Sequence, residues 1–265
     1  MSKRLVCLLL ALLTLLSCPL FAGAEEAAAP SQFYIFVDGQ EVADAHVLLE
    51  NGVTYVSAYH VARALVPDTT VAWESDLVLT GTGYTLSASP ARSYITCNGR
   101  YLYAPGQVKL HPENGDLLLP VRLLARALGA PLGWDGYGVY LATGGTPLES
   151  GESFYDADTL DVLARVVRHE SGNQPLEGQI AVAAVILHRS AGNGITAREV
   201  VNAPGQFPGA LNADPEARHY IAAKLAMDGA DTVPGAYWFN GVGKACWASR
   251  NKRLLYTIGG HAFYG

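Results

Sequence analysis

The chain is short of cysteine, of positive charge and of long apolar runs. Four cysteines in 265 residues are too few for an exported domain held together by disulfides, which carries more and closer pairs. Lysine and arginine number 18 against 24 acidic residues, a net charge of -6, so the basic surface that nucleic-acid binding requires is missing. We therefore expect neither a disulfide framework nor a nucleic-acid partner.

The longest apolar run lies at the N-terminus. Lys3 and Arg4 precede the apolar residues 5–16, and a small-residue cleavage site, Ala-Gly-Ala, ends at residue 24. This pattern is typical of a secretory signal peptide over residues 1–24, and its apolar core is short for a membrane span. We expect a protein that is secreted or associated with the cell wall, with no transmembrane segment after cleavage.

Two of the four cysteines lie in this leader. Residues 15–18, Leu-Leu-Ser-Cys, are also similar to a lipoprotein box with Cys18 as the lipidated residue, although an apolar Pro-Leu-Phe follows. Cleavage after residue 24 leaves Cys97 and Cys246. We expect both to be mostly buried free thiols, with a disulfide between them as the alternative.

Residues 33 to about 143 repeat an internal pattern. Val-Asp-Gly-Gln at 37–40 returns as Cys-Asn-Gly-Arg at 97–100, and TYVSAYHVARALVP returns as LLLPVRLLARALGA. The period of about 60 residues is too long for a solenoid repeat and suits a duplicated small unit. In each unit an Asn/Asp-Gly turn predicts a β-hairpin, and a short strand leads into an amphipathic helix.

Trp73 and Trp134 occupy equivalent places in the two repeats, each on a predicted strand after the helix. We expect both to pack in the core between helix and sheet. The alternative is a platform for sugar binding, because an aromatic face suits the apolar face of a pyranose ring.

The pattern NG-x-L-LLPVR-LARALGA-x-x-WD resembles the copper amine oxidase N-terminal-like domain of exported bacterial proteins. The resemblance covers residues 33–143 and implies attachment or spacing at the cell surface. His46, His60 and His111 are scattered, without the spacing that brings ligands to one metal, so we expect no metal and no cofactor. The polar, turn-rich residues 144–158 are interpreted as a linker.

The second domain, residues 159–265, begins with a predicted helix whose N-cap is Thr159 or Asp158. The apolar positions recur at helical spacing: Leu160, Leu163, Ala164 and Val167. Glu170 continues this buried stripe at the end of the helix, where Gly172 or Asn173 is suited to a left-handed cap. Burial and the helix carbonyls both predict a raised pKa for Glu170, as general-acid catalysis requires.

A second helix is predicted from Pro175, with Gln174 near the cap position. Glu177 then falls at about the third helical position, where free amide groups stabilise its anion. We interpret Glu177 as a helix cap or an electrostatic partner of Glu170, and Gln179 as a supporting residue of the same segment.

The segment LARVVRHESGNQPLEGQIAVAAVILHR resembles the SleB-type cell wall hydrolases, which include spore cortex-lytic enzymes. Further matching pieces follow in order: PGQF at 204–207, DPEARHYIAAKLAMDG at 214–229, AYWFN at 236–240 and GGHAFYG at 259–265. The resemblance implies a lysozyme-like, mainly helical catalytic domain with a small β lobe, so the expected fold class of the chain is α+β. It also implies peptidoglycan glycan strands as the substrate and Glu170 as the catalytic acid/base, in cell wall remodelling or spore cortex lysis.

Three residues depart from this family pattern. His169 replaces a glycine, Ser171 an alanine, and Gln174 a second glutamate. The last change leaves Glu170 intact but puts in doubt any role of a carboxylate at position 174.

Other residues are predicted to bind the glycan. Gln206 is suited to an N-acetyl group and Phe207 to a sugar face. Tyr237 and Phe239 alternate with Trp238 and Asn240 on a predicted strand, so only one pair faces the groove. We favour Tyr237 with Phe239 and place Asn240 at the end of the strand.

His261 is predicted either as a further substrate-binding residue or as a core histidine. A retaining glycosidase needs a second carboxylate about 5 Å from the acid, and an inverting one about 6.5–9.5 Å away. Glu177 is the one further candidate in a matching motif. We therefore expect a single-carboxylate route, lytic transglycosylation, in which Glu170 protonates the glycosidic oxygen and then acts as base.

Three alternatives remain at this point. A cysteine peptidase would use Cys246 and His261, but Cys246 lies in a predicted loop or strand rather than at a helix N-terminus. A metallohydrolase would need a second histidine at HExxH spacing after His169 and Glu170. A peptidoglycan-binding surface protein with a degenerate, inactive hydrolase domain is the alternative outside catalysis.

Overall fold

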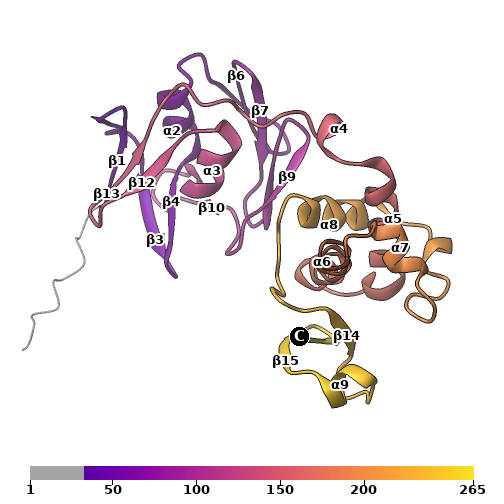
Figure 1. Cartoon of the computed structure of the whole chain (residues 1–265). Coiled ribbons are helices and arrows are strands. Elements are labelled where there is room, and N and C mark those ends of the chain that lie inside the picture. The colour runs from indigo at the N-terminus through magenta and orange to yellow at the C-terminus, as the bar shows by residue number, and fades with distance from the viewer. Residues whose placement is uncertain (1–32) are drawn as a thin grey trace, which may run out of the picture. The chain divides into compact units, whose positions relative to one another are not determined.

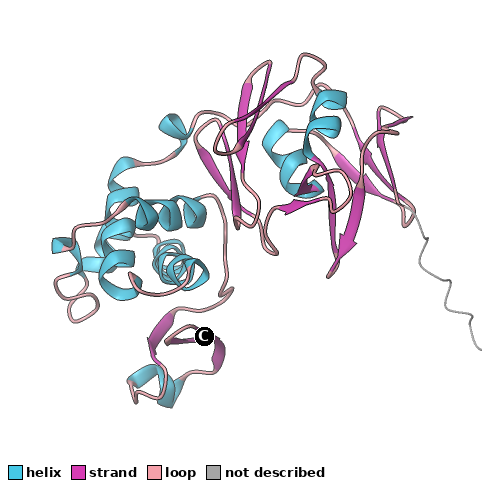
Figure 2. Ribbon diagram, turned by 180° about the vertical axis from the view of Figure 1, so that it is seen from behind, coloured by secondary structure: helices cyan, strands magenta, loops and turns pink. Residues whose placement is uncertain are grey.

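The computed structural model describes residues 33–265 (Figure 1). The predicted signal peptide and the lipoprotein box at Cys18 lie outside these residues. Within them, no helix combines the length and apolar character of a membrane span. Figure 2 shows a strand-rich first part and a helix-rich second part, which confirms the predicted α+β class.

The first domain contains the two predicted repeats. The first repeat comprises β1 (Tyr34–Val37), β2 (Gln40–Glu41), β3 (Val47–Glu50), β4 (Val53–Ser57), α2 (Ala58–Leu65) and β5 (Thr70–Trp73). The second comprises β8 (Tyr94–Cys97), β9 (Arg100–Tyr103), β10 (Lys109–Leu110), β11 (Leu117–Pro120), α3 (Val121–Leu128), β12 (Leu132–Trp134) and β13 (Gly138–Leu141). The hairpin of β6 (Leu77–Gly81) and β7 (Tyr84–Ala88) lies between the repeats.

Two-residue turns join the predicted hairpins. Asp38 and Gly39 link β1 to β2, and Asn98 and Gly99 link β8 to β9, all four with positive φ. Positive φ at both positions is what such tight turns require, and Asn, Asp and Gly adopt it most readily. The hairpin prediction is therefore confirmed.

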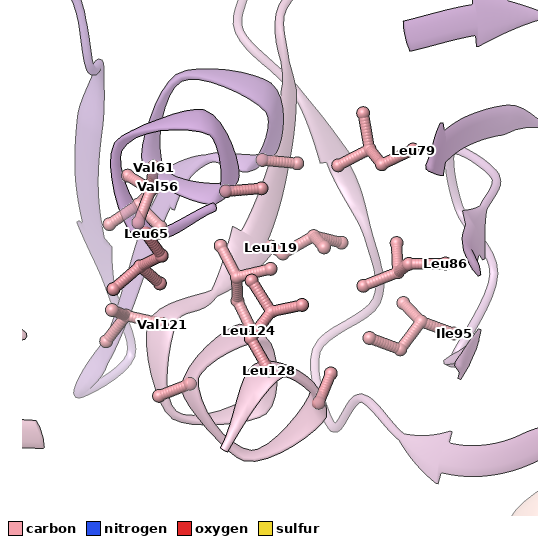
Figure 3. Packing of buried hydrophobic residues seen from close by; sticks show 14 of the residues in the cluster. Val56, Val61, Leu65, Leu79, Leu86, Ile95, Leu119, Val121, Leu124 and Leu128 are labelled. Atoms are coloured by element: carbon pink, nitrogen blue, oxygen red, sulfur yellow. The ribbon is translucent and has the colours of Figure 1, made fainter. Parts of the chain in front are cut away.

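A local twofold relates the two repeats. Strands β4 and β11 pair antiparallel, with Val56 opposite Leu119, and these two residues are equivalent in the aligned repeats. Both helices therefore face one shared core. Figure 3 shows side chains of α2, α3 and strands β6 to β8 pointing into it. Val61 and Leu65 are buried there together with their counterparts Leu124 and Leu128, as predicted.

The prediction of two buried tryptophans was wrong. Trp73 is 55% exposed and Trp134 is 46% exposed. Both lie on strands that form the edge of their sheets, which are ordered β5-β6-β7-β8-β9 and β12-β13-β1-β2. The position of an edge strand depends on tertiary pairing, which the repeat pattern does not reveal.

The histidines of the first domain are not scattered. The Nδ1 atom of His46 lies 2.9 Å from Asp116, the Nε2 atom of His60 lies 3.9 Å from it, and the rings of His46 and His111 are 4.4 Å apart. The Asn114 amide also contacts both ring nitrogens of His46. The His46 nitrogens are thus engaged by Asp116 and Asn114, and residues 33–265 contain no group of three His, Cys, Asp or Glu side chains that could hold a metal ion.

The segment interpreted as a linker is hydrogen-bonded to the first domain. The amide of Leu148 donates to Ala127, and the amide of Gly151 donates to Asn98. The Asn98 side chain donates in turn to the Leu148 carbonyl. A short helix, α4 (Gly151–Phe154), follows before the second domain.

The second domain is built around three helices, α5 (Ala157–Ser171), α6 (Leu176–Asn193) and α8 (Ala217–Met227), which pack against one another. Its remaining elements are α7 (Ala197–Asn202), η1 (Ala210–Asn212), β14 (Trp238–Gly241), α9 (Trp247–Asn251), β15 (Leu254–Ile258) and β16 (His261–Tyr264). Residues 178–186 of α6 are buried on every side, and their alanines allow the other two helices to approach closely. The small sheet has the order β14-β16-β15.

The predicted helix ends need correction. Asp156, not Asp158 or Thr159, caps α5, because its side chain accepts the Thr159 amide. At the other end Gly172 is right-handed and Asn173 has no positive φ; instead, the Gln174 amide donates to the Ser171 carbonyl and closes the turn. Pro175 rather than Gln174 is the N-cap of α6.

Candidate active site

Glu170 lies in the last turn of α5, on the side that the buried stripe of this helix continues. Its side chain is 25% exposed, and burial raises the pKa of the Glu170 carboxyl, while the neighbouring His169 opposes this shift. Within residues 33–265 the carboxylate has no hydrogen-bond donor that would stabilise its charge. A half-buried, unassisted carboxyl of this kind retains its proton to higher pH, as a general acid must.

The Glu170 carboxyl opens onto a hollow of about 490 Å³. The hollow is lined by the following residues: Glu170, Arg189, Gly205, Gln206, Phe207, Trp238, Phe239, Asn240, Gly241, Cys246, Trp247, Ala248 and His261. An adjacent hollow of about 500 Å³ shares Arg189, Gln206 and Trp238 with it and adds Tyr237. Because the two hollows share these residues, we treat them as one groove and call it the active-site groove.

The structure brings most of the predicted substrate-binding residues to this groove. Gln206 lines both hollows. Phe207 is almost fully buried against Phe239, whose ring centroid is 6.2 Å away, so it forms the floor of the groove rather than an open sugar platform. The rings of His261 and Phe239 meet edge to face, and burial lowers the pKa of the His261 imidazole, which favours its neutral form.

The favoured residues Tyr237 and Phe239 both line the groove, but the expectation that only one face of this segment enters it was wrong. Trp238 and Asn240 line the hollow at Glu170 together with Phe239, whereas Tyr237 lines the neighbouring hollow. The strand is short and every residue in it is half-buried, so both faces contribute to the groove.

Arg189 is a groove residue that the sequence prediction missed. Its Nε donates to the Tyr237 carbonyl at 2.6 Å, and its Nη1 donates to Oε1 of Gln206 at 2.8 Å. Burial lowers the pKa of its guanidinium, and its charge has no carboxylate partner within the part of the chain that the structure describes. The available signal was the arginine that ends the motif ILHR.

Two further tryptophans form an aromatic wall. The rings of Trp238 and Trp247 are 5.7 Å apart, and Lys252 Nζ lies 4.4 Å from the centre of the Trp238 ring. Trp247 is mostly exposed. An exposed aromatic face beside a catalytic carboxyl is suited to stacking on a sugar ring. Trp247 follows no motif, so the sequence alone gave no reason to select it.

Cys246 also differs from its prediction. Cys97 is buried, and burial raises the pKa of its thiol to about 12, but Cys246 is only partly buried and lines the groove. Cys246 caps α9, and the hydrogen bond from the Ser249 amide lowers the pKa of its thiol. Both cysteines are free, which excludes the alternative of a disulfide between them.

A cysteine peptidase nevertheless does not fit this groove. Such an enzyme needs a histidine hydrogen-bonded to the thiol. The Cys246 thiol is instead bonded to Ser249, and no bond joins it to His261 among the contacts of residues 33–265.

Glu177 and Gln179 do not line the groove. Glu177 lies at the second position of α6 and accepts a hydrogen bond from the Tyr103 hydroxyl at 3.3 Å. Gln179 is buried and donates to the Gln174 carbonyl. The predicted electrostatic partnership of Glu177 with Glu170 therefore has no support in the geometry.

Gln174 has a structural role that explains why a glutamate is not needed there. Its Oε1 accepts the amide of Gly260 at 2.7 Å and so fastens the hairpin between β15 and β16 to the start of α6. A carboxylate oxygen would make the same bond. Gln174 is not among the residues that line the active-site groove.

Comparisons with known families agree with this division of the chain. Residues 173–264 match the family model of the cell wall hydrolases, and residues 36–142 match that of the copper amine oxidase N-terminal domain. The second domain is a cell wall hydrolase domain. The chain is thus an enzyme of peptidoglycan degradation, and both predicted family resemblances are confirmed.

Two solved structures are similar to the hydrolase domain. The catalytic domain of the Bacillus cereus SleB protein is 26% identical, with 42% of this chain and 92% of that one covered and a TM-score of 0.39. The catalytic domain of the germination-specific lytic transglycosylase SleB from Bacillus anthracis is 25% identical, with 44% and 100% covered and a TM-score of 0.40. No curated protein matches the chain significantly. The family match begins three residues after Glu170.

Proposed function

We propose that this chain is an exported lytic transglycosylase that cleaves peptidoglycan between N-acetylmuramic acid and N-acetylglucosamine, with Glu170 as its single catalytic carboxyl. The observation that carries the proposal is the composition of the groove. Of the residues that line its two hollows within the described chain, Glu170 alone carries a carboxyl. A hydrolase of either stereochemical type would need a second one within about 10 Å.

The proposed reaction needs one carboxyl in two protonation states. Protonated Glu170 donates to the glycosidic oxygen as the bond from that oxygen to C1 of the muramic acid breaks. The C6 hydroxyl of the same sugar attacks C1 and gives its proton to the Glu170 carboxylate. A 1,6-anhydro bond forms, the acid is regenerated, and no water is consumed.

The chemistry of the products tests this proposal. Purified peptidoglycan should be digested with the full chain lacking residues 1–24, and the released fragments analysed by mass spectrometry. We expect 1,6-anhydro ends, which are lighter by one water than reducing ends. Reducing ends would establish hydrolysis, and binding without any released product would establish the inactive, peptidoglycan-binding alternative.

The His169 side chain should set the upper pH limit of activity. When protonated, the imidazole, with Nε2 3.8 Å from Oε1 of Glu170, opposes the raised pKa of that carboxyl. Replacing His169 by Ala removes the opposition, so the pKa of Glu170 rises and the acid stays protonated to higher pH. We expect the alkaline limb of the pH–rate profile to move upward at low ionic strength and the difference to shrink in salt.

Arg168→Ala is the matched control for this prediction. Arg168 is the preceding cation on the same helix, but it lies 3.8 Å from Glu216 and does not shift the pKa of Glu170. Its replacement should leave the alkaline limb in place. Equal shifts in the two variants would show that general charge, not the contact with His169, controls the acid.

The aromatic wall should contribute to substrate binding. Trp247→Ala removes an exposed indole face from the groove. We expect KM for soluble glycan fragments to rise by roughly five- to tenfold, as the loss of about 1 kcal/mol of stacking implies, with kcat little changed. Trp247→Phe keeps an aromatic face and should retain most of the affinity. A fall in kcat without a change in KM would argue against this role.

A further inference from the structure

A second hollow lies in the first domain, away from the active-site groove. It has a volume of about 380 Å³ and lies between the turn joining β3 to β4, the start of α3 and the strand β12. Exposed Trp134 and Leu49 form part of its rim, and Arg122 lies beside them. Exposed apolar surface that is concave and edged by a charge is typical of a binding site.

The internal duplication provides a natural comparison. The local twofold places a smaller hollow of about 140 Å³ beside Trp73, the counterpart of Trp134. In each hollow the turn comes from one repeat, and the helix start and tryptophan come from the other. The two hollows therefore share one architecture. Side chains that differ between them mark properties that one hollow has gained or lost since the duplication.

The two hollows differ in charge. Arg122 lines the larger hollow, and its equivalent in the smaller one is Tyr59. Asp116 lines the smaller hollow, and its equivalent in the larger one is Val53. The hollow at Trp134 thus combines an exposed indole with a cation and has no acid, whereas the hollow at Trp73 has an acid and no arginine.

The charge of Arg122 is available to a ligand. Its side chain is exposed, and no described residue forms an ion pair with it. In contrast, Asp116 is already engaged by Ser57 and His46, which lower the pKa of its carboxyl. Only the larger hollow offers a free charge, and that charge selects an anionic ligand.

We propose that the hollow at Trp134 binds the peptidoglycan strand itself. A hexosamine ring would stack on the indole of Trp134, and a carboxylate of the peptide stem would pair with Arg122. This inference rests on the proposed function for the identity of the polymer. With a second site on the same chain, the enzyme stays attached to its insoluble substrate when the groove releases a product. This attachment raises the effective concentration of glycan strand at the groove for the next binding event.

Co-sedimentation with purified peptidoglycan tests the site. The full chain without residues 1–24 carries Glu170→Gln, so that the polymer is not consumed, and further substitutions are compared in this background. We expect Trp134→Ala and Arg122→Glu each to weaken binding by roughly tenfold. Trp73→Ala, at the twofold-related position, should bind like the parent. Salt should weaken the binding of the parent more than that of Arg122→Glu.

Several outcomes would overturn the proposal. Unchanged binding of both Trp134→Ala and Arg122→Glu, or an equal loss in Trp73→Ala, would show that the hollow is not the site. A parent dimer that Trp134→Ala dissociates, with unchanged peptidoglycan binding, would make it a self-association surface. Arg122 is exposed, so Arg122→Glu remains informative even if Trp134→Ala fails to fold. Sedimentation needs no turnover, so a failure of the proposed activity appears separately, in the product analysis of the unsubstituted chain.

Discussion

Replacing Glu170 by Gln should abolish the release of anhydro fragments from peptidoglycan. The amide has nearly the shape of the carboxyl but can neither donate a proton to the glycosidic oxygen nor accept one from the C6 hydroxyl. General acid–base groups contribute about 100- to 10,000-fold to rate, and in this groove no second carboxyl is present among the described lining residues to replace Glu170. We expect a loss of this size in kcat, measured by mass spectrometry of the products, with substrate binding retained.

The same variant has a stability signature that excludes trivial unfolding. Burial raises the pKa of Glu170 in the folded protein above its value in the unfolded chain. The folded state therefore loses stability as pH rises from the unfolded-state pKa through the folded-state pKa. The Gln side chain does not ionise and avoids this loss. The melting temperature of Glu170→Gln minus that of the parent should therefore be larger at pH 7 than at pH 4. Glu177→Gln, outside the groove, should retain activity; if it were as inactive as Glu170→Gln, a two-carboxylate mechanism would replace the one proposed.

Local rules predicted the parts of this molecule that depend on local chemistry. The Asp38-Gly39 and Asn98-Gly99 turns follow from the φ that these residues tolerate. Glu170 falls on the buried side of α5 because helical periodicity fixes which side chains share a face. Both features are set within about ten residues of sequence, so no tertiary knowledge was required.

The failures have a common physical origin in long-range pairing. Trp73 and Trp134 are exposed because their strands lie at sheet edges. His46 and His60 lie near Asp116 because β11, which Asp116 immediately precedes, pairs with β4. Periodicity within one segment carries no information on either arrangement.

The active-site groove shows the same limit. Arg189, at the end of α6, enters it because the Tyr237 carbonyl and the Gln206 amide oxygen converge on its guanidinium. Gln206 was predicted from its motif, but its bond to Arg189 depends on the folding of residues 17 positions apart. Motifs thus identified members of the groove, whereas only the fold shows which of them are joined.

Asp228 is the most heavily bonded carboxylate in the described chain, although its place in the segment DPEARHYIAAKLAMDG gave no reason to select it. Its side chain is 1% exposed and immediately follows α8, where the helix carbonyls disfavour a negative charge. Arg100 donates to it through Nε and Nη2 at 3.0 and 2.5 Å, and Arg126 donates at 3.1 Å. The Tyr155 hydroxyl and the Tyr101 amide complete the set. These donors come from the first domain and from the segment that precedes α5.

Replacing Asp228 by Ala should therefore be strongly destabilising. A buried ion pair is not in itself a large source of stability, but removing one partner leaves the other charge buried without compensation. In Asp228→Ala the charge left without a partner is that of Arg100, whose side chain is also buried. We expect the free energy of unfolding of this variant to be lower than that of the parent by about 3–5 kcal/mol. Urea denaturation should show this as a lower midpoint, and calorimetry should show the single transition of the parent dividing into two as the domains lose their coupling.

The exposed pair of Asp158 and Arg198 provides the matched control. It is also a bidentate contact between a carboxylate and a guanidinium, but both partners are open to solvent, where water replaces the lost bond. Asp158→Ala should leave the midpoint and the single transition unchanged. Equal urea midpoints for Asp228→Ala and Asp158→Ala would show that the cluster around Asp228 does not couple the domains. The hydrogen-bonded segment before α5 would then be the connection between them. Among residues 33–265, Asp158 has Arg198 as its one side-chain partner and is open to solvent, whereas Asp228 is buried among several donors. The comparison therefore shows what burial and the additional donors contribute beyond a bidentate ion pair.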